Sequence, residues 1–377
     1  MKIKVCCVDE DGRYGGPQSR MIDVYKKMNF NKFKYEFIIP SNITIFKKKL
    51  KKINAKFYEF QITRLSLDFV LFLKYIIFFP LEILILNKFF IEKKYDLVQI
   101  NGVPHFKSAI AAKLSNIPVV WVVEDSYSPK ILVLIFKIVV KICDAKIIYL
   151  SQKVYDFYLK DLNINRKNLH KIMSPTNSEY FKGKKIKNKK KLNICSVSGF
   201  LNVKDPETFL NVAKEVIKKY ENISFYFVGR GTKNESRYYK KIINIYNSLD
   251  PLIKKKIIFL GMRLDIKKVL KKSDIFLCTS KSEGGPIVVW EAMSMNLPVV
   301  TTNVGGIPEY IKNGYSGYIC NIEDYKGISQ KILKLIKSFN LRKKFGTRSR
   351  KVVEQFLDSK VISKKYQKVY ESVSKRL

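Results

Sequence analysis

The sequence predicts an α/β protein of two domains, each built on a doubly wound parallel sheet. The length of 377 residues suits two domains of ordinary size. Short β-branched runs alternate with longer helical patterns along most of the chain, which is typical of parallel strands covered on both faces by helices. The segment Gly183–Lys191, GKKIKNKKK, has almost nothing to bury and separates two such series.

Each series contains five expected strands. The first comprises Ile3–Val8, Tyr35–Ile39, Leu97–Ile100, Val119–Val123 and Ile147–Leu150. The second comprises Leu192–Val197, Ser224–Val228, Ile257–Leu260, Ile275–Cys278 and Val299–Thr302. The end of the chain reads as helices over Tyr325–Lys337, Leu341–Phe356 and Ser359–Ser374. We expect domains over residues 1–182 and 192–358, a basic linker over 183–191, and a helical tail over 359–377 that can pack back on the first domain.

The charge of the chain narrows its possible partners. Lys and Arg number 72 against 32 Asp and Glu, a formal net charge of +40. Most of these cations are lysines, whereas proteins that read nucleic acids rely on arginine for bidentate contacts. We therefore expect no nucleic-acid partner, and we favour nucleotide phosphates or an anionic membrane surface. An AT-rich coding bias would explain part of the lysine excess.

The cysteines and the first residues indicate the compartment. The six cysteines form no CxxC pair and most lie in apolar runs, which predicts buried, reduced thiols. The start MKIKVCCVDE enters a strand without the apolar h-region of a signal peptide. We expect a cytoplasmic protein.

The most apolar region is Leu65–Phe90. Charges such as Glu82, together with Pro80, keep each uninterrupted apolar run below the roughly 20 residues that span a bilayer, so no transmembrane helix is expected. The region is either a long helix buried against a sheet or a partly exposed face that dips into the membrane interface. The lysines of Lys47–Lys52, just upstream, would favour the interface. A second apolar helix, Ile131–Cys143, is expected to be core.

The most informative motif surrounds Gly284-Gly285-Pro286, which is expected to end a strand-side loop and open a helix with Pro286 at the first helical position. Free backbone N–H groups at such a turn bind anions or hydroxyls. Glu283 precedes the turn and Glu291 lies inside the helix. A carboxylate accepts two hydrogen bonds from a vicinal diol, so the pair suits a sugar and a ribose. The alternative is two solvated glutamates.

These residues, followed by Pro298, Gly305-Gly306 and Glu309, resemble the retaining glycosyltransferases of the GT-B fold, specifically glycosyltransferase group 1 (family four). The resemblance covers nearly the whole chain. It extends to further short segments, namely CSVSGFLNVKD near Ile194–Lys204, Val228–Gly231, Leu260-Gly261 and Ser273-Asp274. It implies two Rossmann-like domains.

The resemblance also implies a reaction. A hexosyl or N-acetylhexosaminyl group would pass from a nucleotide-sugar, such as a UDP- or GDP-sugar, with retention at the anomeric carbon and without metal or other cofactor. Glu283 would contact the donor sugar, Glu291 the ribose, and Lys204 the leaving diphosphate, whose charge grows in the transition state. Further donor contacts would come from Gly199, Gly261, Met262, Gly284, Gly285 and Pro286.

The chain departs from the family pattern at several places. This chain has Gly199-Phe200 where the family usually has Gly-Arg, so it lacks the arginine that contacts the diphosphate. Arg230 would take over that contact. Glu124 stands where the family commonly has a histidine. The family often has a second histidine near residues 96–101, where this chain has Gln99 and Asn101. Glu124 would accept a proton from a sugar or acceptor hydroxyl, or it is an inert loop acid.

Two features near the start of the chain concern the acceptor and a metal. Gly15 and Gly16 resemble the family's glycine loop near the acceptor and the diphosphate, although a plain strand-to-helix turn would look the same. Asp9 and Asp11 spell the D-x-D by which other glycosyltransferases hold a divalent metal. Their place at the end of the first strand of a GT-B-like chain favours no metal site.

The sequence therefore predicts a cytoplasmic enzyme, peripheral on the inner face of the membrane, that glycosylates a glycan or lipid-linked acceptor in cell-surface polysaccharide or lipopolysaccharide biosynthesis. The acceptor is expected on the first domain. The alternatives are a GT-B-fold epimerase or phosphorylase, and an inactive nucleotide-sugar-binding or membrane-scaffold protein. Phe200 and Glu124 keep the inactive alternative open.

Overall fold

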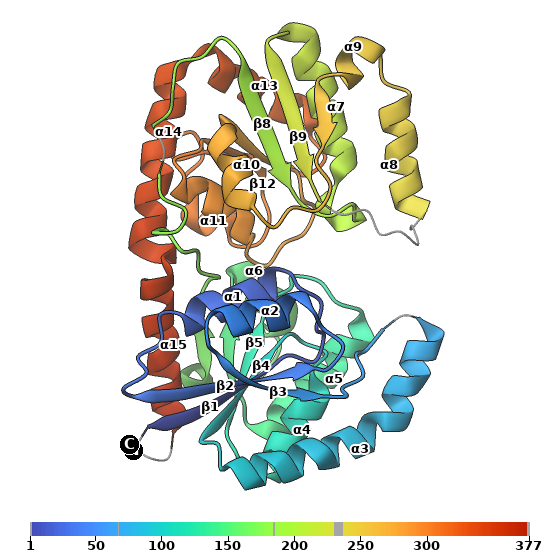
Figure 1. Cartoon of the computed structure of the whole chain (residues 1–377), viewed down its shortest axis with the longest axis vertical. Coiled ribbons are helices and arrows are strands. Elements are labelled where there is room, and N and C mark those ends of the chain that lie inside the picture. Colours follow the sequence, from blue (N-terminus) through green and yellow to red (C-terminus); the bar gives the residue numbers. More distant parts are fainter. Residues whose placement is uncertain (1, 67, 184, 230–236, 375–377) are drawn as a thin grey trace. The chain divides into compact units, whose positions relative to one another are not determined.

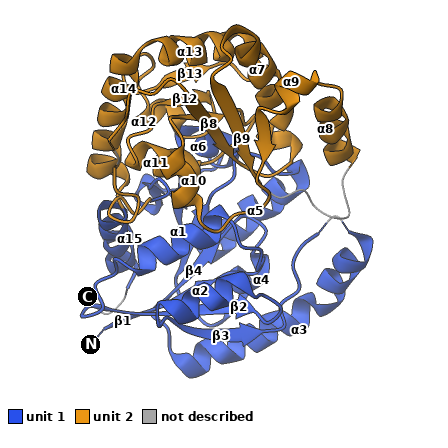
Figure 2. Ribbon diagram, turned by 45° about the horizontal axis from the view of Figure 1, so that its top comes forward, with its two compact units in different colours: residues 1–175, 359–377 blue, residues 176–358 orange. Residues whose placement is uncertain are grey.

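The chain folds into two units, coloured separately in Figure 2. In this computed structural model, unit 1 comprises residues 1–175 and 359–377, and unit 2 comprises residues 176–358. The structure describes residues 2–66, 68–183, 185–229 and 237–374. The chain thus crosses between units at 175/176 and again at 358/359, and the basic segment 183–191 falls within unit 2.

Unit 1 contains a sheet of seven parallel strands in the order β3-β2-β1-β4-β5-β6-β7 (Figure 1). The strands are β1 (Ile3–Val8), β2 (Phe33–Pro40), β3 (Lys56–Phe60), β4 (Leu97–Asn101), β5 (Val119–Val123), β6 (Lys146–Tyr149) and β7 (Leu169–Lys171). The strand order reverses between β1 and β4. In doubly wound sheets, ligands bind beyond the carboxyl ends of the strands at such a reversal.

The helices of unit 1 cover both faces of this sheet. They are α1 (Gly16–Tyr25), α2 (Ile45–Lys52), α3 (Phe69–Lys93), α4 (Phe106–Leu114), α5 (Lys130–Cys143), α6 (Gln152–Tyr158) and α15 (Ser359–Val373), with a 3-10 turn at Arg166–Asn168. Right-handed crossovers place α1 and α2 on one face and α3, α4 and α5 on the other, because the two groups connect strands in opposite directions along the sheet. Helix α3 packs on α4, α4 packs on α5, and α15 packs on α1.

Unit 2 contains six parallel strands in the order β10-β9-β8-β11-β12-β13, with a reversal between β8 and β11. The strands are β8 (Leu192–Val197), β9 (Ile223–Val228), β10 (Ile257–Phe259), β11 (Ile275–Cys278), β12 (Val299–Thr302) and β13 (Tyr318–Cys320). The helices are α7 (Pro206–Lys219), α8 (Arg237–Asn247), α9 (Pro251–Lys254), α10 (Ile266–Lys272), α11 (Ile287–Ser294), α12 (Ile307–Tyr310), α13 (Tyr325–Lys337) and α14 (Phe339–Val352), with a 3-10 turn at Asn202–Lys204 and a π-helical turn at Val353–Leu357.

The fold class predicted from the sequence is confirmed. Each of the ten expected strands is present, with ends shifted by at most two residues. Three strands were not expected, namely β3, β7 and β13, and all three are short. The two chain crossings lie beside each other, since the Thr176 N–H donates to Leu357 O at 2.9 Å and the Ser178 hydroxyl donates to Asp358 Oδ2 at 2.6 Å.

Helix α3 differs from the buried helix that was one expectation for Leu65–Phe90. It is a continuous helix of 25 residues that runs through Pro80. By length and composition it alone, among the described residues, is apolar enough to cross a membrane, with a mean hydropathy of 2.3 over an 18-residue window of which 22% is buried. Helix α5, expected to be core, buries Phe136 but leaves Leu134 exposed.

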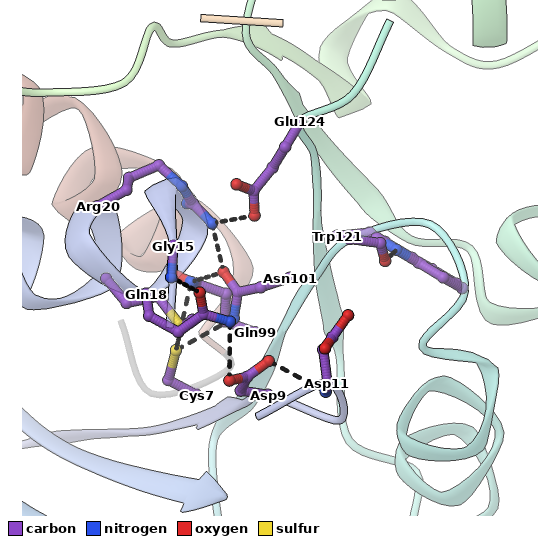
Figure 3. A network of polar contacts seen from close by, with 12 residues as sticks. Cys7, Asp9, Asp11, Gly15, Gln18, Arg20, Gln99, Asn101, Trp121 and Glu124 are labelled. Atoms are coloured by element: carbon purple, nitrogen blue, oxygen red, sulfur yellow. Dashed lines mark hydrogen bonds and ion pairs between the residues drawn. The ribbon is translucent and has the colours of Figure 1, made fainter. Parts of the chain in front are cut away.

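A buried polar network ties α15 to the rest of unit 1, and Figure 3 shows its part around Arg20, Asn101 and Glu124. The Arg20 guanidinium of α1 is fully buried and donates to Glu124 Oε1 at 2.5 Å, Asn101 Oδ1 at 2.8 Å and the Tyr366 hydroxyl at 2.7 Å. The Tyr370 hydroxyl, one turn further along α15, donates to the Gln99 side chain. Arg20 therefore joins the ends of β4 and β5 to a helix that follows the whole of unit 2 in the chain.

We expect Arg20→Met to destabilise unit 1 by about 3–5 kcal/mol, because it leaves the Glu124 carboxylate buried without its cation. Burial already raises the pKa of Glu124 against the opposing attraction of Arg20. Without Arg20 this pKa rises further, so the folded variant binds a proton that the unfolded chain releases, and its stability falls as pH rises. The variant's loss of unfolding free energy relative to the parent should therefore be larger at pH 8 than at pH 5.

Urea unfolding can measure this effect in unit 1 alone. The chain has two tryptophans, Trp121 in unit 1 and Trp290 in unit 2, so a Trp290→Phe background leaves one reporter. The control is Arg20→Met/Glu124→Met, which should recover most of the lost stability and show no excess loss at pH 8. Equal deficits at both pH values would contradict a charged pair.

Candidate functional site

Two predicted catalytic residues of unit 2 lie in contact at the reversal between β8 and β11. Lys204 Nζ donates to Glu283 Oε1 at 2.7 Å, and the Ser280 hydroxyl donates to the same oxygen at 2.8 Å. The two side chains are 27% and 14% exposed, respectively, so both reach solvent at a partly buried position. A cation and a carboxylate are thus held together where a doubly wound sheet binds its ligands.

Backbone contacts hold the two loops that supply this pair. Asp205 follows Lys204 with a φ of 49° and caps α7 by accepting from the Thr208 N–H at 3.2 Å. The Thr279 hydroxyl at the end of β11 donates to Asp205 O at 2.9 Å, and the Lys281 N–H donates to Val203 O at 2.9 Å. The sequence analysis did not single out Asp205 or Thr279. Asp205 followed by Pro206 at the start of α7 is a helix-capping pattern that could have been recognised in the sequence.

The turn at Gly284-Gly285-Pro286 is shaped by a second glycine pair. Gly305 has a φ of +48°, and a Cβ on it would lie 2.4 Å from Glu283 O and 2.5 Å from Gly284 O. The Gly306 N–H donates to Gly284 O at 3.2 Å. Pro286 precedes α11 as its cap, one residue earlier than expected. The backbone approach that fixes Glu283 thus requires glycine at position 305.

Glu291 lies on the outward side of an otherwise buried helix. In α11, Val288 and Glu291 are half-buried, and the other six residues are buried. Residues three apart share one face of a helix. The structure therefore presents Glu291 on the same helix that the GGP turn opens, as the sequence suggested.

Three further turns meet at the carboxyl ends of β8, β9 and β10. The Gly229 N–H donates to Gly261 O at 3.0 Å, and a Cβ on Gly229 would lie 1.6 Å from Ser198 O. Gly199 is half-buried beside them, Gly261 has a φ of +64°, and Met262 is 45% exposed. This cluster contains Gly199, Gly261 and Met262, three of the donor contacts named from the sequence, and Arg230 lies outside the described residues.

Phe200 is a core residue. Its ring lies 4.8 Å from Phe227, 5.1 Å from Tyr239 and 5.4 Å from Phe259, measured between centroids, and the side chain is 7% exposed. The residue that replaces a family arginine therefore packs into the hydrophobic core of unit 2 and does not present a side chain to a ligand.

In unit 1, the glycine loop is ordered by a glutamine (Figure 3). The Gly15 N–H donates to Gln18 Oε1 at 2.9 Å, and Gln18 Nε2 donates to Asp9 Oδ2 at 3.0 Å. Gly16 is the first residue of α1. Asp11 pairs with Arg13 at 2.5 Å. The two carboxylates of the D-x-D pattern are thus engaged by different side chains of the chain itself.

Glu124 and Asn101 are brought together by Arg20, a residue that the sequence analysis missed. Asn101 is 2% exposed and also donates to Val8 O at 3.0 Å. Glu124 is 7% exposed and is held as the partner of a buried guanidinium. A lone arginine among the apolar residues of α1 was the available signal, but its partners lie far away in the sequence.

A lysine-lined pocket lies where β2 ends and α2 begins. It has a volume of about 350 Å³ and is lined by residues 41–44 with Lys47, Lys48 and Lys51. Lys47 is paired with Glu59 at 2.8 Å. The lysine cluster of α2 therefore lines a concave site at the carboxyl edge of the sheet.

If nucleotide-sugars bind as the sequence predicts, we expect Gly305→Ala to abolish most of the thermal stabilisation that they give, because its Cβ displaces the turn that carries Glu283. The matched control is Gly314→Ala, where φ is +75° and nothing lies within 4 Å of the new Cβ. Both variants should lose about 1–2 kcal/mol of stability from the left-handed backbone, and Gly305→Ala should lose more because its Cβ also meets two backbone oxygens. Equal ligand-induced shifts in the two variants would show that the Gly305 contact does not shape the site.

Curated relatives resemble parts of the chain. It is 29% identical over 181 residues to the N-acetyl-alpha-D-glucosaminyl L-malate synthase of Bacillus anthracis, which covers 48% of this chain and 45% of that protein. It is 28% identical over 262 residues to the UDP-Gal:alpha-D-GlcNAc-diphosphoundecaprenol alpha-1,3-galactosyltransferase of Escherichia coli, covering 63% of this chain and 66% of that protein. The chain therefore spans about half to two thirds of the length of these relatives.

Solved structures resemble the whole chain. HepE of Anabaena, in complex with UDP and glucose, matches with a TM-score of 0.82 at 18% identity and covers 98% of this chain and 100% of that one. A glycosyltransferase of Rickettsia africae matches with a TM-score of 0.81 at 18% identity over 100% of both chains. At this identity the likeness shows the fold.

The family model of glycosyl transferases group 1 matches residues 177–352. This range is nearly the whole of unit 2, residues 176–358. It contains the Lys204–Glu283 pair, the GGP turn and Glu291. In unit 2, this GT-B-fold chain is therefore similar to the glycosyl transferases group 1 family.

Proposed function

We propose that the protein is a retaining, metal-independent glycosyltransferase that moves a hexosyl or N-acetylhexosaminyl group from a nucleotide-sugar to a lipid-linked or membrane-borne glycan in cell-surface polysaccharide biosynthesis. The observation that carries the proposal is the contact between Lys204 and Glu283 at the β8/β11 reversal, just before the helix that carries the half-buried Glu291. The group 1 family match and the UDP-bound state of HepE support a nucleotide-sugar donor.

In the proposed reaction, each residue has a separate task. Lys204 stabilises the leaving diphosphate, whose negative charge grows as the bond to the anomeric carbon breaks. Glu283 accepts hydrogen bonds from the donor sugar, and Glu291 accepts them from the ribose. Because Lys204 and Glu283 neutralise each other in this structure, a donor that contacts both exchanges one ion pair for two charge-assisted contacts.

The acceptor side is proposed to lie in unit 1. The name of the E. coli relative specifies an acceptor linked to diphosphoundecaprenol, and the lysine-lined pocket after β2 has the charge to hold such a diphosphate. Glu124, positioned by Arg20, is proposed to accept a hydrogen bond from a hydroxyl of the acceptor. Six buried free cysteines suit a reducing compartment, so we place the enzyme in the cytoplasm, peripheral to the membrane.

The function can be tested with radiolabelled UDP-, GDP- and ADP-sugars and a diphosphate-lipid acceptor carrying one sugar. We expect label to enter the lipid with one of these donors, and NMR of the product to show the anomeric configuration of the donor. Adding EDTA should leave the rate unchanged. A large loss in EDTA would restore the Asp9/Asp11 metal alternative, and donor binding without transfer or hydrolysis would indicate an inactive nucleotide-sugar-binding protein.

We expect Lys204→Met to lower kcat by about 10²- to 10³-fold, the scale on which a group aimed at developing charge contributes. The matched control is Lys281→Met, a lysine of the neighbouring loop whose partner is Glu323. It should retain kcat within a factor of about two. Arg230→Ala should cost less than Lys204→Met. The reverse order in side-by-side kinetics would assign the diphosphate to Arg230.

A further inference from the structure

Unit 1 exposes an unusually large apolar surface on α3 and α5. On α3, Phe69, Phe72, Ile76 and Ile77 are 71%, 43%, 53% and 66% exposed. On α5, Leu134 and Ile138 are 54% and 51% exposed. Exposed apolar patches on this scale mark sites of interaction, whereas isolated exposed apolar residues do not.

These side chains belong to one face of unit 1. Helices α3, α4 and α5 are successive crossovers on the same side of the sheet, with α4 packed between the other two (Figures 1 and 2). We call this surface the α3–α5 face. In the first half of α3, residues 69–79, Tyr75 is the one buried side chain. A helix segment that is apolar nearly all round suits either a protein core or a membrane.

The charges on the α3–α5 face favour a lipid surface over a second copy of the chain. The first half of α3 carries Lys74 as its one charged residue, and α5 carries Lys130, Lys137 and Lys141 without an acid. A second copy would bring two cationic faces and two net charges of +40 together. An anionic bilayer instead offers acyl chains to the aliphatic side chains and headgroups to the lysines.

A buried charge cluster determines how α3 can meet that bilayer. Glu82, near the middle of α3, is buried and paired with the fully buried Lys107 of α4. Glu82 also accepts from the Thr63 N–H at 2.9 Å, and Lys107 lies 4.5 Å from the Tyr75 ring and 4.0 Å from Glu10 Oε2. We call this set the Glu82 clamp.

The Glu82 clamp opposes a spanning orientation. At 1.5 Å per residue, the 25 residues of α3 are long enough to cross a bilayer. Crossing would pull Glu82 into hydrocarbon and leave Lys107 buried in unit 1 without its main partner, which is strongly unfavourable. The lysine cluster of α2, by contrast, lies on the opposite face of the sheet, so it is not part of this surface.

We propose that the α3–α5 face inserts into one leaflet of an anionic membrane, with α3 held parallel to the surface by the Glu82 clamp. Apolar insertion supplies most of the binding, and the lysines of α2 stay free for the acceptor. The inference rests on the proposed function, since a membrane-borne acceptor gives the insertion its purpose, but it concerns a different surface and can fail separately.

The first experiment is cosedimentation of the full chain with vesicles of phosphatidylcholine, with and without phosphatidylglycerol. Ile77→Glu and, separately, Leu134→Glu should each weaken binding about 10-fold or more, because a buried aliphatic side chain contributes on that scale. The control is Lys48→Glu/Lys51→Glu on α2, which should weaken binding less than 3-fold. The control lowers the net charge by 4 and each single variant lowers it by 1. If charge attraction alone caused binding, the control would therefore lose more vesicle binding than the single variants.

The second experiment tests orientation. All six native cysteines are buried, so Gln61→Cys and Glu92→Cys place new thiols before α3 and at its end. Both should react with a membrane-impermeant maleimide added outside preformed vesicles. Protection of one end would show a spanning helix and overturn the parallel orientation.

Other outcomes separate the remaining possibilities. Absence of vesicle binding, or loss of it only in the α2 control, would overturn the inference. So would a dimer in light scattering that Ile77→Glu dissociates, because the face would then join two copies. Transfer to a short, water-soluble acceptor should persist in Ile77→Glu. If transfer fails in the parent chain as well, the proposed function fails while the membrane result stands.

Discussion

The geometry of both units depends on a constraint of parallel sheets, in which right-handed crossovers bring the carboxyl ends of all strands to one edge. Loops that leave neighbouring strands at this edge have little room. In unit 2, Ser198 O occupies the space of a side chain at Gly229, and Glu283 O that of one at Gly305. Close backbone approach therefore holds the turns in place, and the position of the Lys204–Glu283 pair follows from it.

Unit 1 uses a different means at the same edge of its sheet, namely buried charges. Arg20 links α1 to the last residue of β4 and the first residue after β5, and Lys107 links α4 to Glu10 after β1 and to Glu82 of α3. Apolar residues of similar volume would stabilise the fold about as well. The benefit of the ion pairs is directional, because each fixes the helices relative to particular strand ends.

The sequence predicted those features that depend on a short, continuous stretch of residues. Ten strands appeared as apolar runs, and the GGP turn with its two glutamates identified the site of unit 2. The strands β3 and β13 were missed because edge strands with few buried residues lack a continuous apolar run. Arg20 was missed because its partners Glu124 and Tyr366 are distant in sequence. The exposure of α3 could not be predicted from the sequence, since a helix in a protein core and a helix at a membrane show the same run of apolar residues.

The return of α15 to unit 1 affects how the protein is made. Residues 176–358 are synthesised before α15 emerges, so unit 2 can fold while unit 1 still lacks Tyr366, Tyr370 and the core positions that α15 fills. During that interval Arg20 has no phenol partner and the surface of α1 on which α15 packs is uncovered, while the apolar α3 lies exposed on the opposite face of the sheet. During translation two apolar surfaces are therefore uncovered at the same time. α15 later covers the one on α1, whereas α3 stays available to a chaperone or a bilayer.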